Sequence, residues 1–394
     1  MYFNPAVLKI NLLPLWCHIA LLCFTSAFFF AESSKQLNNI YYYFLCIPAL
    51  IIIFTEKLHL LNLSRFFYLF FGLVGWITIT GLLSSAPVTE VLKELKPIIY
   101  LLFLAAVIFY VSNKKPNFLV HFFYVLLISA SISGFILTYE FYQPRHWNFL
   151  IRLRGSGAIS NSIWVGAVYG SAALSSIILF LHQKTFAQQS CALLLGVIPL
   201  LVMLLSQSRG PMVAFVIALI YTLVLYRNRR AALMAAVMII LGILVVANFG
   251  NLSEQTRIFG GDSYRLGIWS NAINEISKAP LFGHGIAEDT KNFIDSRTFD
   301  HYHNVYLSLA FHSGFIGLAL LLALTIYPLI SHKTIHTTTI RPLLLFGMVY
   351  MLFDGNRLFT SPKELWLIFW IPLLLLWAYN NSTDQLPKPV NAAL

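Results

Sequence analysis

The sequence predicts an all-α polytopic membrane protein with about 12 transmembrane helices. Of its 394 residues, 58% are hydrophobic and only 10% are charged, whereas a soluble domain carries about 25% charged residues. Apolar stretches of about 17 to 25 residues, long enough to cross a bilayer as helices, recur along the chain. They are too long and continuous for the strands of a membrane barrel. We therefore expect one integral membrane domain over residues 1–394.

Nine expected spans precede the longest loop, and their boundaries fall near 12–30, 38–55, 66–83, 96–111, 118–142, 162–181, 190–206, 210–226 and 231–249. Three more follow the loop, near 304–330, 342–354 and 364–380. The first span lacks a convincing small-residue cleavage site, so we expect it to be retained. The loop itself, residues 250–303, is expected to be partly helical. Its acidic stretch EDTKNFID (288–295) is interpreted as a solvated helix.

The basic residues predict the orientation of these spans. If the N-terminus is cytoplasmic, the cytoplasmic face carries twelve of the 26 basic residues but only Glu56 and Asp384 of the 15 acidic residues. Almost the whole formal net charge of +11 then lies on that face, as the positive-inside bias requires. Both termini are therefore expected in the cytoplasm and loop 250–303 on the outer face. A basic balance of this origin orients the chain and does not indicate nucleic-acid binding.

Several arginines nevertheless fall on the outer face, which usually has few. They occur in the segment QPRHWNFLIRLRGSG (143–157), in SQSRGP (206–211) and in loop 250–303. Any one of them could extend to lipid head groups or pair with a loop acid. Arg209 differs because it is fixed at a tight junction between two spans, two residues before Pro211, which favours a helix start. Fixed guanidinium groups at the interface suit a ligand with anionic oxygens, above all phosphate.

A histidine stands where the tenth expected span begins, in HYHNVYLSLAFHSGFIGL (301–318). In a regular helix, His303 and Gly314 lie about 20° apart, with Gly317 continuing the same stripe and His312 about 180° away. His303 could simply cap the helix or bond to head groups, and glycines of this kind often serve packing alone. In a set with the arginines, however, a neutral imidazole can accept a proton from a hydroxyl. The parts together suit transfer from a phosphorylated lipid to a hydroxyl.

Four motifs, in order, resemble those of the bacterial O-antigen ligases, which belong with the O-antigen polymerases and the protein O-oligosaccharyltransferases. SQSRGPMVAF is similar to the arginine motif before a span, YRLGIW to the start of the long periplasmic loop, and PLFGHGIAED to the glycine element of that loop. HNVYLSLAFHSGFIG has the pattern of the His-Asn…Gly…Gly signature. The motifs cover about residues 150–330, and for the first five spans the resemblance rests on topology.

The resemblance implies an enzyme of lipopolysaccharide biosynthesis at the periplasmic face of the inner membrane. It would transfer a glycan from undecaprenyl diphosphate to a sugar hydroxyl of lipid A-core, with inversion and without metal, nucleotide or other cofactor. Carried onto this chain, His303 would be the catalytic base, and Arg209 and Arg265 would bind the donor diphosphate. Further substrate-binding positions would be Arg152, Arg154, Asn304, Gly283, Gly285, Gly314 and Gly317. The residues agree on the lack of metal, since no His/Asp cluster with ligand spacing stands beside His303.

Other functions remain open. An O-antigen polymerase uses the same lipid-linked donor but extends another lipid-linked glycan. A protein O-oligosaccharyltransferase usually has an added C-terminal region, and this chain ends soon after the last expected span. A flippase or transporter would share the span count, but such proteins place ionisable residues near the membrane midplane. Here His121, Glu140 and Asp354 lie only near span ends or boundaries, which disfavours transport.

Overall fold

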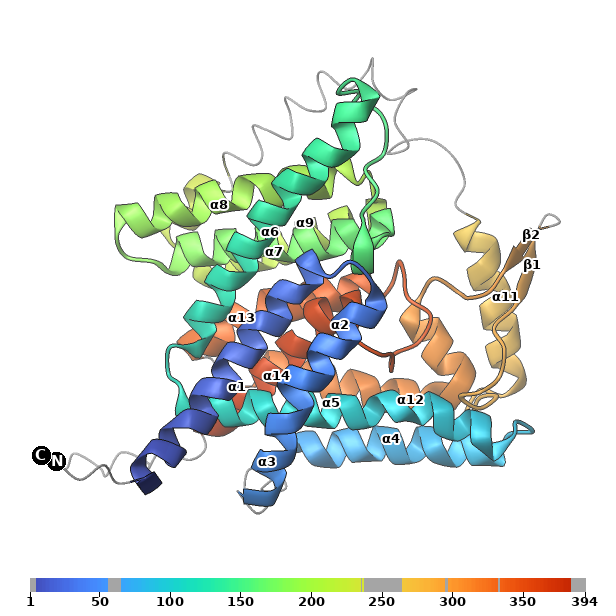
Figure 1. Cartoon of the computed structure of the whole chain (residues 1–394). Coiled ribbons are helices and arrows are strands. Elements are labelled where there is room, and N and C mark those ends of the chain that lie inside the picture. The colour runs from blue at the N-terminus through green and yellow to red at the C-terminus, as the bar shows by residue number, and fades with distance from the viewer. Residues whose placement is uncertain are drawn as a thin grey trace, which may run out of the picture.

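The computed structural model describes residues 5–55, 65–234, 236, 264–294, 297–331 and 334–383, and this part of the chain is mostly helical (Figure 1). The first half contains α1 (Pro5–Phe30), α2 (Ser34–Tyr41), the π-helical turn η1 (Tyr42–Cys46), α3 (Ile47–Thr55), α4 (Arg65–Leu83), α5 (Val88–Lys114), α6 (Phe118–Tyr142), η3 (Gln143–Arg145), η4 (Gly157–Ile159) and α7 (Ser162–His182). The second half contains α8 (Phe186–Leu205), α9 (Arg209–Tyr226), α11 (Arg265–Lys278), β1 (Asn292–Ile294), β2 (Arg297–Phe299), α12 (Val305–Ile330), α13 (Ile335–Tyr350), the π-helical turn η6 (Trp366–Trp370) and α14 (Ile371–Thr383).

Nine helices in the described ranges are long and apolar enough to cross a membrane, and they coincide with the first eight expected spans and the tenth. The chain is thus a multi-pass membrane protein. The ninth expected span, 231–249, and the first residues of the loop, 250–263, lie outside the described residues except for 231–234 and 236. The last two expected spans correspond to shorter helices. α13 has 16 residues and ends at Tyr350, before the expected boundary, and the apolar helix Trp366–Asn380 follows.

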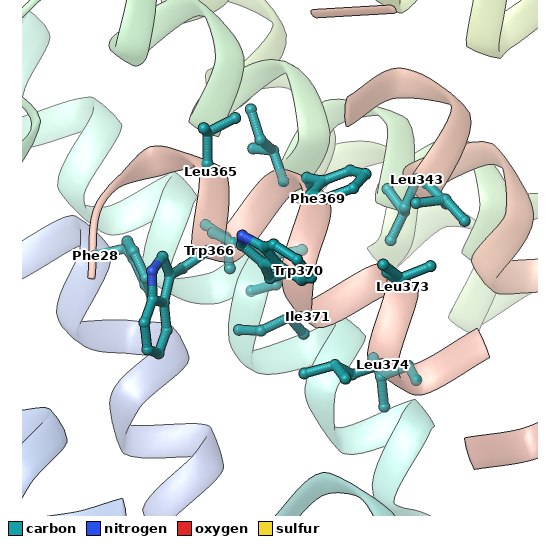
Figure 2. Packing of buried hydrophobic residues seen from close by; sticks show 14 of the residues in the cluster. Phe28, Leu343, Leu365, Trp366, Phe369, Trp370, Ile371, Leu373 and Leu374 are labelled. Atoms are coloured by element: carbon teal, nitrogen blue, oxygen red, sulfur yellow. The ribbon is translucent and has the colours of Figure 1, made fainter. Parts of the chain in front are cut away.

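The C-terminal helix forms the centre of the bundle, which explains how it can be short. Residues 364–380 are all buried, and a helix that is apolar all round is typical of a core position. α14 packs against α5, α12 and α13, and η6 packs against α7 and α13. Three fully buried indoles, those of Trp366, Trp370 and Trp377, fill the interior. Figure 2 shows Trp366 and Trp370 among side chains of the neighbouring helices.

One end of the bundle collects the segments that the sequence assigns to a single face. Main-chain hydrogen bonds of 2.9 Å join Ala158 to Ala31, Leu153 to Leu205, and Val305 to Met351. The described part of the loop lies on the same side of the bundle (Figure 1). These contacts agree with the expected alternation of helix ends, while the orientation in the membrane stays a prediction.

The described part of the loop is partly helical, as expected, but the helix expected over 288–295 is wrong. Residues 292–294 form β1, which pairs antiparallel with β2 through Asn292–Phe299, Phe293–Thr298 and Ile294–Arg297. Ile268, Ala272 and Ile276 of α11 share a small apolar core with Tyr302, Ala310 and Phe311. This core fixes α11 against the first turns of α12.

Candidate active site

A polar cavity of about 490 Å³ lies where three separate stretches of the chain meet. Its lining comes from the stretch between α6 and α7, from the α8–α9 turn, and from the described loop up to the start of α12. The lining residues are Arg152, Ile163, Gln207, Ser208, Arg209, Gly210, Pro211, Tyr264, Arg265, Arg297, Phe299 and His303. Four guanidinium groups and no carboxylate of the described residues line this space, so it is strongly positive.

The tight turn between α8 and α9 anchors Arg152. Gln207 adopts a left-handed conformation there (φ +46°) and donates through Nε2 to the carbonyl of Leu150 at 3.0 Å. Arg152 donates from Nε to the carbonyl of Ser206 (2.8 Å) and from Nη2 to Oγ of Ser208 (2.9 Å). A guanidinium held by two such bonds keeps a fixed direction, as expected of an anion-binding group.

Helix starts add to the positive potential of the cavity. Arg209 is the first residue of α9, and Arg265 is the first residue of α11. Unsatisfied N–H groups give a helix N-terminus a partial positive charge and make it a binding site for anions. His303 stands immediately before Asn304, the N-cap of α12. Two helix starts with arginines and one with a histidine therefore line one cavity.

The described loop forms part of the cavity wall through Tyr264, Arg297 and Phe299. The guanidinium of Arg297 lies 5.1 Å from the ring centroid of Tyr264, and the rings of Tyr264 and Phe299 lie 5.6 Å apart. Arg297 was only one of several loop arginines in the sequence. The β1–β2 hairpin brings it to the same space as Arg209.

His303 has a partner that is distant in sequence. Its Nδ1 lies 3.0 Å from Oδ1 of Asp354, and Tyr350 donates to Oδ2 of the same carboxylate at 3.2 Å. A carboxylate only accepts, so Nδ1 carries the proton and Nε2 is the nitrogen left with a lone pair. The Asp354 side chain is 5% exposed and that of His303 is 28% exposed, as suits a buried orienting group and an accessible ring.

Electrostatics keeps this pair in the arrangement a base requires. Burial raises the pKa of the Asp354 carboxyl, but the hydrogen bonds from His303 and from the backbone of Gly355 help to outweigh it and hold the pKa below its usual value. Asp354 therefore stays ionised. Burial and the neighbouring His303 lower the pKa of His301, whose ring centroid lies 3.9 Å from that of His303. His301 is thus neutral in the folded protein near neutral pH.

The expectation that no His/Asp cluster stands beside His303 is wrong. His301, His303 and Asp354 each offer one ligand atom, and these atoms lie within 4.8 Å of one another. The spacing could not reveal this, because Asp354 lies 51 residues beyond His303. A metal ion bound to all three would compete with the His303–Asp354 hydrogen bond.

The helical stripe expected to join His303 to Gly314 does not exist. α12 begins at Val305, and His303 has a φ of +51°, outside helical geometry. Gly314 interrupts the helix with φ +66° and ψ −174°. A Cβ on Gly314 would lie 2.0 Å from the carbonyl oxygen of Leu281, so the kink admits the loop backbone. A shared stripe for His303 and Gly314 requires one unbroken helix through both residues, which the chain does not form.

The remaining glycines and Asn304 hold the loop and α12 in shape. Gly283 (φ +72°) packs on the backbone of residues 312–314, and Gly285 (φ +95°) packs on Ser84. Gly317 packs on Ser313. Asn304 caps α12 by accepting from the N–H groups of Tyr306 and Leu307. Neither these glycines, Gly314, nor Asn304 lines the cavity.

Two further residues are placed differently from expectation. Arg154 is exposed and does not line the cavity, although Arg152, two residues before it, does. His312 is buried, with its ring nitrogens 2.6 Å and 3.1 Å from the carbonyl oxygens of Ser308 and Glu288. It joins α12 to the loop.

Comparison with known proteins bears on this site. Residues 192–322 match the family model described as O-antigen ligase. This stretch is thus similar to an O-antigen ligase domain. It is also 28% identical over 372 residues to an O-antigen ligase of Pseudomonas aeruginosa, covering 91% of this chain and 88% of that protein. The resemblance noted in the sequence is thereby confirmed.

The O-antigen ligase match encloses four of the residues on which the cavity depends, Arg209, Arg265, Arg297 and His303. Arg152 and Asp354 lie outside it but reach the same site. Sequence reasoning missed Asp354 as a partner, although an acid at a span boundary was a visible signal. It also passed over Arg297, one of the arginines on the outer face.

Proposed function

We propose that this protein transfers a glycan from undecaprenyl diphosphate to a sugar hydroxyl of lipid A-core at the periplasmic face of the inner membrane. The observation that carries the proposal is the convergence of His303, paired with Asp354, and four arginines on one cavity. A base beside a diphosphate-sized cationic space is what this transfer needs. The family match supports a glycosyltransferase-type enzyme.

In the proposed reaction, the acceptor oxygen forms a bond to the anomeric carbon as the bond from that carbon to the diphosphate oxygen breaks. Nε2 of His303 takes the hydroxyl proton, and Asp354 stabilises the imidazolium that forms. Undecaprenyl diphosphate leaves with the electron pair, and Arg209, Arg265 and Arg297 neutralise its charge. Attack from the face opposite the leaving group inverts the anomeric configuration. No step requires a metal ion.

A second cavity beside the cationic one suits the lipid part of such a donor. It has a volume of about 460 Å³ and is lined by Phe135, Thr138, Tyr139, Trp147, Phe149, Ile198, Leu201 and Leu205. Leu205 lines this apolar cavity, and Gln207, two residues on, lines the cationic one. A ligand with an anionic head and an apolar chain fits this pair.

Reconstitution tests the proposal. The full chain in liposomes receives a polyprenyl-diphosphate glycan and lipid A-core, and products are read by mass spectrometry. A mass increase on lipid A-core is expected. Growth of the lipid-linked glycan alone would indicate an O-antigen polymerase, and movement of the donor across the bilayer without transfer would indicate a flippase.

The proposed orientation is tested separately by cysteine labelling in a variant without the four native cysteines. Ser277→Cys on α11 should react with an impermeant maleimide in intact spheroplasts. Ala187→Cys, exposed at the start of α8, should react only after lysis. The reverse pattern would place the cavity in the cytoplasm and exclude a periplasmic reaction.

A further inference from the structure

A third cavity is separated from the cationic one by the backbone at residues 302–303. Its volume is about 460 Å³, and its lining includes Asn271, Asn274, Glu288, Tyr302 and Phe311. Tyr302 lines this space while His303, the next residue, lines the cationic cavity. The two cavities therefore lie on either side of the Tyr302–His303 peptide. We call this third space the amide cavity.

Both α11 and the β1–β2 hairpin contribute to both spaces. α11 supplies Arg265 to the cationic cavity and Asn271 and Asn274 to the amide cavity. The hairpin supplies Arg297 to one and Phe293 to the other.

The chemistry of the amide cavity differs from that of its neighbour. No arginine of the described residues lines it, and its acids are Glu275, Glu288 and Asp289. Glu275 pairs with Lys278 at 2.7 Å, and Asp289 pairs with Lys291 at 3.1 Å. The remaining carboxylate, that of Glu288, makes the space unfavourable for a diphosphate. Carboxylates and amides together accept from and donate to hydroxyl groups.

The amides face the cavity from one side of a helix. Asn271 and Asn274 are three residues apart on α11, a spacing that places side chains together. Neither side-chain amide hydrogen-bonds to another described residue, so both are available to a ligand. Each amide offers donors and an acceptor, which matches adjacent hydroxyls of a sugar ring.

Two buried aromatic rings, those of Tyr302 and Phe311, support the wall of the cavity and are rigidly held. Phe311 stacks on His284 with ring centroids 4.5 Å apart and lies edge-on to Tyr302 at 5.5 Å. His284 donates from Nε2 to the carbonyl of Glu275 at 2.9 Å, and its N–H donates to the carbonyl of Phe311 at 2.8 Å. The kink at Gly314 permits this docking. The ring of Phe293, which is 72% exposed, also lines the cavity, and an apolar ring together with polar groups suits the apolar and polar surfaces of a pyranose.

We propose that the amide cavity is a saccharide-binding site that holds uncharged sugar residues of a substrate glycan. Its role in transfer rests on the proposed function, because Tyr302 lines this cavity and His303, the proposed base, is the next residue. The sugars could come from the acceptor or from the donor glycan. Both present the same hydroxyl-rich chemistry, and the experiment separates them.

The test compares two double variants of the full chain on the same helix. Asn271→Leu/Asn274→Leu removes both amides, and Ser270→Leu/Ser277→Leu makes matched changes at exposed positions that do not line the cavity. Calorimetry uses two soluble probes, delipidated core oligosaccharide and glycan released from the lipid-linked donor. We expect one probe to bind the wild type and the serine variant equally, and the asparagine variant at least about 10-fold more weakly, since two sets of hydrogen bonds are lost.

Steady-state transfer identifies the source of the sugar. A higher KM for lipid A-core alone assigns the site to the acceptor, and a higher KM for the glycan donor alone assigns it to the donor. If no probe binds the wild type, or if both variants bind alike, the inference is overturned. If the probes discriminate as expected but no preparation transfers glycan, the saccharide site stands and the proposed function fails.

Discussion

Asp354→Asn should strongly reduce transfer although it changes only a charge in a side chain of the same size. The Asp354 carboxylate accepts from Nδ1 of His303 at 3.0 Å, which leaves the lone pair on Nε2 towards the cavity. An amide in its place can donate to Nδ1 and so favours the opposite tautomer, in which Nε2 carries the proton. The base then loses its acceptor nitrogen.

The size of the effect follows from the two limits that the geometry sets. One hydrogen bond to a charged group contributes about 1.5–3 kcal/mol, which corresponds to roughly 10- to 100-fold in rate. Complete loss of a positioned base, as in His303→Ala, costs about 10²- to 10⁴-fold. We therefore expect Asp354→Asn to lower kcat by about 10- to 100-fold. The kcat of Asp354→Asn should be at least as high as that of His303→Ala.

The assay is a double-mutant cycle in reconstituted liposomes, with transfer to lipid A-core as the readout. Because Asp354 acts through His303, Asp354→Asn should cost little more once His303 is alanine. Tyr350→Phe, which removes only the second hydrogen bond to the carboxylate, should cost less than Asp354→Asn. An equal fold-loss from Asp354→Asn in both backgrounds would make Asp354 a structural residue and refute the pairing as a catalytic device.

Four further outcomes are expected. Arg209→Lys should lose most transfer activity because a point charge does not replace a planar fork, whereas Arg154→Lys, at an exposed position outside the cavity, should match the wild type in the same assay. His312→Ala and Gly314→Ala should both make loop 264–303 more sensitive to limited proteolysis, since each disturbs the docking of the loop on α12; unchanged digestion would show that the loop is held elsewhere. Chelation with EDTA should leave transfer unchanged, and loss that Zn²⁺ or Mg²⁺ restores would assign a metal to the histidine–aspartate cluster. Burial lowers the pKa of His301 in the folded protein. As pH falls below about 6.5, the unfolded state therefore takes up a proton on this residue before the folded state does. The apparent Tm should fall with pH in that range, and it should fall less steeply in His301→Gln.

A long apolar stretch is enough to predict a membrane helix, so the nine long spans were predictable from local sequence alone. The sequence also allowed Arg152, Arg209 and Arg265 to be identified, because arginines expected on the outer face depart from the positive-inside bias. α13 and α14 turned out shorter than spans, since a helix enclosed by other helices need not match the bilayer thickness. Only the packing of the whole bundle reveals that enclosure.

The features that escaped prediction depend on chain contacts across long separations. Asp354 meets His303 through the Val305–Met351 hydrogen bond and the turn after α13, neither of which leaves a periodic signal. The kink at Gly314 is stabilised by backbone from residues 280–285, so an argument from helical register alone could not detect it. The amide cavity likewise consists of ordinary polar residues whose grouping exists only after the loop folds back.

The arrangement of charge favours surface chemistry over transport. Every residue that lines the cationic cavity comes from a helix start, a turn or the described loop, at one end of the bundle. A carrier needs a binding site that opens in turn to each face, usually near the bilayer midplane. Here the middle of the bundle is filled by η6 and α14, whose residues from 366 to 380 are all buried. Moving a diphosphate past the indoles of Trp366, Trp370 and Trp377 would require this tightly packed centre to open. Opening would break the contacts that hold α5, α7, α12 and α13 together. A reaction completed at one face needs no such opening, and a rigid centre would keep His303 and the arginines in register.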